Sequence, residues 1–461
     1  MASNSSTKTK IIDQFHVSQP PGSVPDSSSI QLSFFDVAWL FTGPVERLFF
    51  FSLPISTVDF KSTHIPALQS SLSETLQQFY PLAGLVRPCP ETSPDNQFEF
   101  YFCANNTIPF SLAESSSNFD KITGNEMKDF TELYSLVPQL PRANDGTIPL
   151  TAIQVTVFPG KGICIGVSMH HVACDDSSFM HFVKSWASSC QIEPVKAIGL
   201  PPPLFDRAII SDPNHLYSKT LSEMKEILSK GPPPASECPS PLNQSRPLIS
   251  TFVLTREQID ALKEGLIAKS DGPPLHCSSF TVACAYAWVC LIKSQETITD
   301  NIITEKSAHL LFSVDCRYRL QPPIPAGYFG NCLRPCFVEA SLQELHLQGG
   351  VFTAAMAIGK AIKGLDEGVL QGAEGWFRKI LSLVPNRPMS VGGSPRYRVY
   401  DVDFGWGRPT KVELLSIGHT PGTVSLAESR DGKGGIEIGV VLPENEMQQF
   451  ESCFSNGILY V

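Results

Sequence analysis

The stretch Ser168-Met169-His170-His171-Val172-Ala173-Cys174-Asp175-Asp176 closes an alternating apolar run and opens an amphipathic one. The residues before it, from Ile163 to Met169, alternate in the manner of a strand with one buried face. By the same alternation His171 continues that face and points towards a core or a lined cavity. Asp175 follows four positions later. A histidine that ends a strand is held firmly and can still face a cleft. We therefore expect the catalytic residues of the chain in this stretch.

The residues on both sides of this stretch predict a hairpin followed by a helix. Residues 148–158 and 162–170 are the two strands, joined across Pro159-Gly160-Lys161-Gly162. Asp176 or Ser177 is expected to cap the helix that follows. The apolar stripe of that helix consists of Phe179, Phe182, Val183 and Trp186.

The N-terminal part of the chain predicts an arm and then a series of buried elements. Residues 1–30 are expected to form a loose arm, because Pro20-Pro21-Gly22-Ser23-Val24-Pro25 blocks regular structure. The other elements expected here are strands over 32–39, 48–53 and 98–103, and a helix over 67–79 that ends at Tyr80-Pro81-Leu82-Ala83-Gly84.

A change of composition divides the chain into two halves. Proline clusters at Pro201–Pro203, Pro232–Pro234 and Pro239–Pro247 indicate a long crossover over 191–248, with one short helix near 221–228. The second half is expected to contain helices over 257–268, 280–293, 352–365 and 370–383, and strands over 250–254, 310–315, 397–403, 411–417 and 435–442.

These elements predict an α/β fold of two similar-sized lobes, each a mixed β-sheet with flanking helices. Residues 1–190 form the N-terminal lobe with the His171 motif, and residues 249–461 form the C-terminal lobe with a loop around Asp403. Part of 350–400 is able to pack on the N-terminal lobe.

Composition excludes several classes of protein. The chain has 461 residues and a formal net charge of −10, which argues against a nucleic-acid partner. Its 13 cysteines lack paired spacing, so we expect free thiols in a reducing compartment and no metal site. No apolar run approaches about 18 residues and Met1–Lys10 lacks an apolar signal core, so we expect no membrane association and a cytosolic protein.

The imidazole of His171 is the candidate general base. A neutral imidazole with an ordinary pKa takes a proton from a hydroxyl at physiological pH, provided that its tautomer is fixed. Asp175 could hold the other ring nitrogen, or it could brace the loop through a distant arginine. The spacing does not decide between these, nor does it exclude a satisfied core histidine beside a capping aspartate. Cys174 is expected to be a packing residue, and no Gly-x-Ser-x-Gly elbow supplies a serine nucleophile.

A second motif is Asp403-Phe404-Gly405-Trp406-Gly407. Two glycines around a tryptophan make a tight loop that lets the backbone approach a neighbour closely. The alternative interpretation is an ordinary glycine turn with an anchoring aromatic side chain.

Taken together, the two motifs resemble those of the plant BAHD acyl-CoA-dependent acyltransferases. The order of His171–Asp175 and Asp403–Gly407 and their separation are similar, and further matching segments are Phe79–Gly84, Val314–Arg317, Tyr328–Cys332 and Leu426–Gly432. The segment Tyr328-Phe329-Gly330-Asn331-Cys332 looks like that of the branch that malonylates anthocyanin, flavonoid and other phenolic glucosides.

The resemblance implies a chloramphenicol acetyltransferase-like fold with a channel between the lobes. His171 would be the general base for direct transfer from malonyl-CoA, the cosubstrate, to a sugar hydroxyl, with no acyl-enzyme and no bound cofactor. Asp175 would pair with Arg317. The family implies Asp403 as a second catalytic candidate, although we expect its loop, with Gly405, Trp406 and Gly407, to be mainly architectural.

The resemblance also leaves open questions about the donor. Asp176 stands where the family usually has glycine, and a carboxylate there would repel a malonyl group unless it caps the helix. Acetyl- or hydroxycinnamoyl-CoA is the alternative donor, and a non-catalytic small-molecule-binding homologue is the alternative function.

Family members are mostly monomers, so we expect a monomer. Candidates for binding the CoA phosphates or the acyl carboxylate are Lys263, Ser278, Ser279, Arg396 and Arg398, each of which could instead be a surface cation or a capping serine.

Overall fold

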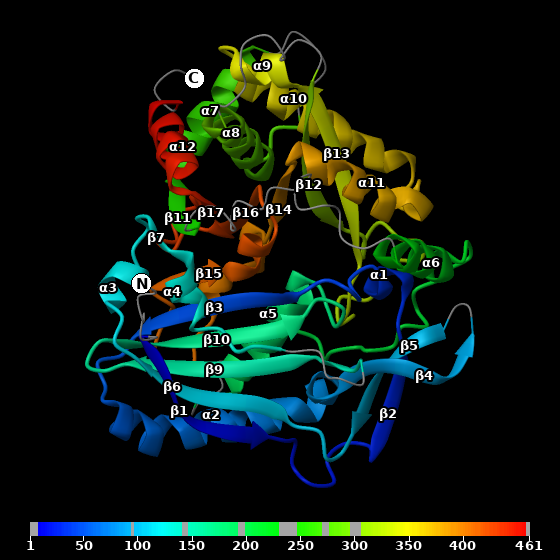
Figure 1. Cartoon of the computed structure of the whole chain (residues 1–461), viewed down its shortest axis with the longest axis vertical. Helices are drawn as coiled ribbons and strands as arrows, with labels where there is room; N and C mark the ends of the chain where they lie inside the picture. The colour runs from blue at the N-terminus through cyan, green and yellow to red at the C-terminus, as the bar shows by residue number, and fades with distance from the viewer. Residues whose placement is uncertain are drawn as a thin grey trace.

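The computed structural model describes residues 8–93, 96–140, 146–191, 199–229, 247–269, 276–295 and 306–457. The chain forms two lobes, one above the other in Figure 1, and each lobe has its own hydrophobic core. The α/β fold class expected from the sequence is confirmed.

A six-stranded sheet in the order β1-β6-β9-β10-β3-β15 is the centre of the N-terminal lobe. Its strands are β1 (Thr9–Val17), β6 (Ile108–Ser115), β9 (Thr151–Phe158), β10 (Gly162–His170), β3 (Pro44–Ser52) and β15 (Lys411–Leu414). β10 pairs antiparallel with β9 on one side and β3 on the other, which confirms the expected hairpin. Helices α2 (Thr57–Phe79) and α5 (Asp176–Ser189) pack against each other, and α2 also packs on β9. His171, the residue that follows β10, is therefore attached to a strand that is paired on both sides.

A four-stranded sheet and several short helices complete the N-terminal lobe. The sheet has the order β2-β5-β4-β8, with β2 (Ser27–Gln31), β5 (Asn96–Cys103), β4 (Leu85–Ser93) and β8 (Ile148–Pro149). The helices are α1 (Phe34–Val37), η1 (Tyr80–Ala83), α3 (Phe119–Ile122) and α4 (Phe130–Tyr134).

A seven-stranded sheet in the order β13-β12-β14-β16-β17-β11-β7 is the centre of the C-terminal lobe. Its strands are β13 (Leu333–Ser341), β12 (Ser307–Asp315), β14 (Met389–Gly392), β16 (Thr423–Glu428), β17 (Ile436–Pro443), β11 (Pro247–Leu254) and β7 (Lys128–Asp129). The α-helices of this lobe are α7 (Arg256–Ala268), α8 (Ser279–Ser294), α9 (Leu342–His346), α10 (Gly350–Lys363), α11 (Trp376–Leu383) and α12 (Glu444–Gly457). Short 3-10 helices are η4 (Gly364–Glu367), η5 (Ala373–Gly375), η6 (Val384–Asn386), η7 (Pro395–Tyr397), η8 (Val399–Asp401) and η9 (Leu415–His419).

Each half of the chain contributes one strand to the sheet of the other. β7, from the N-terminal half, pairs with β11, and β15, from the C-terminal half, pairs with β3. Buried Lys128 on β7 lies 3.0 Å from Glu413 on β15. Lys411 on β15 lies 3.3 Å from Glu437 on β17. The lobes are therefore joined by paired backbone and by buried ion pairs.

The expected loose arm over 1–30 is wrong for the residues that the structure describes. β1 pairs antiparallel with β6, and β2 pairs with β5. Both strands keep many side chains exposed, so their apolar pattern is weak although their backbones are paired. The proline-rich segment 20–25 connects the two strands.

The expected strand over 32–39 is also wrong, because these residues contain helix α1. Ser33 caps this helix in a capping box with Asp36, a local arrangement that outweighs the apolar run. Helix α2 begins at Thr57 rather than 67, with Pro66 inside it.

In the C-terminal half, the expected strand over 397–403 is wrong. The segment turns through η7 and η8, since Arg398 has a φ of +52° and breaks the extended backbone. Strands β13, β14 and β16 were not expected. The helix expected over 370–383 is confirmed only from residue 376 on.

The described part of the crossover, 199–229, contains helix α6 (Leu216–Ser229), which packs against α1. The prolines at 232–234 and 239–246 lie outside the described residues. Within the ranges described, none of the helices combines the length and the hydropathy that a membrane crossing requires.

Candidate active site

His171 lies in the turn between β10 and α5. Its imidazole stacks on the indole of Trp39, with ring centroids 3.7 Å apart and planes 3° apart. The Nδ1 atom is buried and has no well-formed hydrogen bond among the described residues. Burial lowers the pKa of His171, and the opposing effects of the adjacent backbone, Asp175, Asp176 and the Asn331 side chain are smaller. The imidazole is therefore neutral at physiological pH, the form that accepts a proton.

Asp175 is fully buried and fixes the turn rather than the imidazole. Its Oδ1 accepts a hydrogen bond from the Ser178 N–H at 3.1 Å, which caps α5. Its oxygens also face both terminal nitrogens of Arg317, with Nη1–Oδ2 at 2.8 Å and Nη2–Oδ1 at 3.1 Å. The Asp175–Arg317 pair that the resemblance implies is present. The cap expected at Asp176 or Ser177 is wrong, because Asp175 already occupies that position.

Arg317 also holds the loop that precedes β13. Its Nη2 donates to the Gly330 carbonyl oxygen at 3.0 Å, and the Cys332 N–H donates to Asp175 Oδ2 at 3.2 Å. The segment 328–332, whose role the sequence did not define, is thus bound to the N-terminus of α5.

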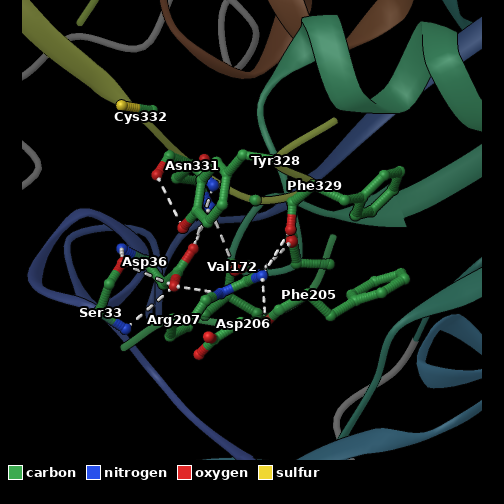
Figure 2. A network of polar contacts seen from close by, with 12 residues as sticks. Ser33, Asp36, Val172, Phe205, Asp206, Arg207, Tyr328, Phe329, Asn331 and Cys332 are labelled. Atoms are coloured by element: carbon green, nitrogen blue, oxygen red, sulfur yellow. Dashed lines mark hydrogen bonds and ion pairs between the residues drawn. The ribbon is translucent and has the colours of Figure 1, made fainter. Parts of the chain in front are cut away.

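A second buried ion pair, between Asp36 and Arg207, also supports the turn (Figure 2). Arg207 Nε lies 3.0 Å from Asp36 Oδ2, and Arg207 Nη2 donates to the Ala173 carbonyl at 3.2 Å. Asp36 Oδ1 accepts from the backbone and side-chain nitrogens of Asn331 at 3.1 and 3.0 Å. Asn331 Nδ2 in turn donates to the His171 carbonyl at 2.9 Å. Two arginine–aspartate pairs therefore hold the backbone of the turn.

Sequence reasoning did not find Trp39, Asp36 or Arg207. Arg207 and Asp36 are 171 positions apart, so no local pattern relates them. The one available signal was Ser33-x-x-Asp36, which is typical of a helix N-terminus and would have indicated α1.

Asp176 forms a two-pronged ion pair with Arg47 on β3. The Nη1–Oδ1 and Nη2–Oδ2 distances are 2.8 and 2.9 Å, and the Arg47 guanidinium also lies over the Phe179 ring at 5.4 Å. The Arg47 side chain is 2% exposed and that of Asp176 is 14% exposed. The extra carboxylate is therefore largely neutralised by a partner that the sequence did not suggest.

Asp403 closes its own loop. Its Oδ1 accepts hydrogen bonds from the N–H groups of Gly405 at 2.7 Å and Gly407 at 2.9 Å. The two glycines have φ values of +94° and +85°, which favour glycine. Trp406 packs edge-on against Phe51 of β3, with centroids 5.6 Å apart. The loop therefore packs on the N-terminal core, a correction to its expected place in the C-terminal lobe.

Three of the candidate CoA-binding residues lie near one another. Ser278 caps α8 and Ser279 is its first residue, while Lys263 on α7 lies 3.5 Å from Asp260. Burial raises the pKa of Cys277, and Lys263 is close enough to oppose that effect. A cation, two hydroxyl groups and a helix N-terminus thus share one region.

Arg396 and Arg398 are exposed, and they lie on turns rather than on the expected strand. Arg398 Nε lies 3.0 Å from Asp401. The intervening Tyr397 carbonyl accepts a hydrogen bond from Lys184 of α5 at 2.8 Å, which ties this segment to the helix that follows His171.

The remaining reactive side chain of the motif is Cys174. Burial raises the pKa of its thiol well above the ordinary value, so it is protonated and inaccessible. Clusters of side chains able to hold a metal ion do not occur in the part of the chain that the structure describes.

Comparison with known proteins places these features in a family. The model of the Transferase family matches residues 16–456. The chain is 35% identical to malonyl-coenzyme:anthocyanin 5-O-glucoside-6'''-O-malonyltransferase of Salvia splendens, over 98% of this chain and 96% of that protein. It is 36% identical to coumaroyl-CoA:anthocyanidin 3-O-glucoside-6''-O-coumaroyltransferase 1 of Arabidopsis thaliana, over 97% of each chain. Among solved structures, vinorine synthase matches with a TM-score of 0.67 at 20% identity and 96% coverage of both chains.

Proposed function

Because the chain belongs to the Transferase family, the BAHD acyltransferases that its motifs resemble, we propose that it transfers an acyl group from CoA to a sugar hydroxyl of a phenolic or flavonoid glucoside. The observation that carries this proposal is the neutral His171 in a turn held by two buried ion pairs. The acyl-CoA is a cosubstrate, and the reaction needs no bound cofactor.

In the proposed reaction, Nε2 of His171 accepts the proton of the acceptor hydroxyl. The oxygen attacks the thioester carbonyl and forms a tetrahedral intermediate. Collapse of this intermediate breaks the C–S bond, and the imidazolium returns its proton to the departing thiolate. The products are the acyl ester and free CoA.

Direct transfer is supported by the state of the neighbouring side chains. Both oxygens of Asp175 are engaged by Arg317 and by backbone N–H groups, so this carboxylate is a brace. The Cys174 thiol is buried and protonated, which disfavours a thioester on the enzyme. For Asp403 we propose the architectural role, because its carboxylate binds its own loop.

We propose malonyl-CoA as the donor. Several relatives have names that specify malonyl transfer, among them phenolic glucoside malonyltransferase 2 of Arabidopsis thaliana at 34% identity. The charge of Asp176 does not oppose this donor, since Arg47 pairs with it. A hydroxycinnamoyl donor is the second candidate, because a relative of equal similarity is named as a coumaroyltransferase.

For the CoA phosphates we propose Lys263 with Ser278 and Ser279 at the N-terminus of α8, where the helix dipole also favours an anion. Arg396 and Arg398 remain candidates for the acyl carboxylate or a phosphate. We further propose a monomeric, cytosolic enzyme without nucleic-acid or membrane partners, in keeping with the net charge of −10.

The test compares initial rates with malonyl-, acetyl- and coumaroyl-CoA on one flavonoid glucoside, with CoA release followed by a thiol reagent. We expect malonyl-CoA to be preferred, and His171→Ala to lower turnover by about a hundredfold or more with the fold intact. Full activity of His171→Ala would refute the base assignment, and a strong preference for coumaroyl-CoA would refute the donor. Lack of acceptor-dependent release over a panel of phenolic glucosides would favour the non-catalytic homologue.

A further inference from the structure

The face-to-face contact between Trp39 and His171 has no part in the reaction as described so far. The two ring planes are parallel to within 3° and their centroids are 3.7 Å apart, which is full van der Waals contact. Trp39 is half-buried and packs against the N-terminal core. An aromatic ring in this position covers one face of the imidazole and does not itself block the ring edge that carries the nitrogens.

This contact matters because Asp175 does not orient the ring of His171. A catalytic imidazole is commonly oriented by a partner on the nitrogen that does not react. In the described chain, Nδ1 of His171 has no well-formed hydrogen bond, and Asp175 is turned towards Arg317. The stack is thus a direct restraint on rotation of the imidazole about its χ2 angle.

Trp39 is itself held by the main chain of Asp36, the residue whose carboxylate supports the backbone of His171 through Asn331. Its N–H donates to the Asp36 carbonyl at 2.9 Å, and its own carbonyl accepts from Thr42 N at 3.2 Å. The Asp36 side chain binds Asn331, which donates to the His171 carbonyl (Figure 2). One buried aspartate therefore fixes the turn with Trp39 and, through Asn331, the backbone of His171.

We propose that Trp39 is the positioning residue of the general base, holding the imidazole in its reactive plane and stabilising the imidazolium that forms during acyl transfer. The second effect arises because the negative face of an indole attracts a cation stacked on it. Phenylalanine would keep a flat face with a weaker attraction, whereas leucine would remove both. The inference rests on the proposed role of His171 as the base.

The experiment compares Trp39→Phe and Trp39→Leu, each with His171 and with His171→Ala. With His171, we expect Trp39→Leu to lower kcat by about tenfold or more, since misorientation of a catalytic group is costly. Trp39→Phe should stay within about threefold of the parent, because the aromatic face is retained. The KM values for both substrates should change little, and thermal unfolding reports whether each variant is folded.

The His171→Ala background separates this role from general damage. If Trp39 acts through His171, Trp39→Leu causes no further loss of kcat once the imidazole is absent. An equal loss in both backgrounds, or an unchanged kcat for folded Trp39→Leu, would overturn the inference. Activity that survives His171→Ala would instead overturn the proposed function, so the two failures are distinguishable.

Tryptophan emission gives a readout that is independent of turnover. A protonated imidazole quenches a stacked indole, so titration of His171 should appear in the emission of Trp39. The ring centroids of His64 and Trp406 are 5.5 Å apart, so titration of His64 supplies a second pH-dependent change in tryptophan emission. The component to follow is therefore the one lost in both Trp39→Phe and His171→Ala. Loss in only one of the two variants would contradict the stacked pair.

Discussion

At the scale of the residue, the state of His171 determines the pH range of the enzyme. Burial lowers its pKa below the ordinary 6.5, so the neutral base persists at a lower pH than for an exposed histidine. A general base works above its pKa, and we therefore expect the midpoint of the acidic limb of kcat/KM to lie below pH 6.5. Measurement of kcat/KM between about pH 5 and about pH 9 checks this, with buffers at constant ionic strength. An acidic limb with a midpoint above 6.5 would contradict the lowered pKa of His171.

At the scale of the element, the start of α5 depends on the Asp175–Arg317 pair. Asp175→Ala removes the helix cap and leaves Arg317 buried without its main partner, so we expect a loss of about 3–5 kcal/mol in the free energy of unfolding. Asp175→Asn keeps a capping acceptor, and its loss should be smaller. The double change Asp175→Asn with Arg317→Met should cost less than the sum of its parts, because no unpaired charge remains. Urea unfolding is measured for the parent, the three single variants Asp175→Ala, Asp175→Asn and Arg317→Met, and the double variant. Strictly additive losses would mean that the two side chains do not interact.

At the scale of the whole molecule, strands β7 and β15 make the lobes interdependent. Burial alone would raise the pKa of Glu413, but Lys411 and Lys128 outweigh it and hold the carboxyl in its charged form. Glu413→Gln leaves these lysines short of negative charge, so we expect a loss of about 3–5 kcal/mol. Because the Glu413–Lys128 ion pair joins a strand of one sheet to a strand of the other, calorimetry should show one unfolding transition, at a lower temperature for the variant. Two separate transitions, with only one of them shifted, would show that the lobes unfold independently.

Contacts between residues close in the sequence could be predicted, whereas contacts between residues far apart in the sequence could not. The turn of His171, the strands around it and the Asp403 loop could be predicted because their patterns are local. The Arg317 partner of Asp175 came from a family resemblance, not from spacing. Arg47 and Asp176 are 129 positions apart, and their pairing depends on the packing of α5 beside β3. The apolar pattern predicted a strand at Trp39. The contact of its ring with His171 depends instead on helix α1 and the turn that follows it.

Gly330 is the point at which the two ion pairs around His171 meet. Its carbonyl binds Arg317, while a Cβ at this position would lie 2.7 Å from the Arg207 guanidinium carbon. Even a methyl group there would have to displace the partner of Asp36, and with it the support of the His171 turn. Variation at the residues around His171 must therefore leave this position unchanged. A library designed around the site would lose function at residue 330 for reasons unrelated to substrate choice.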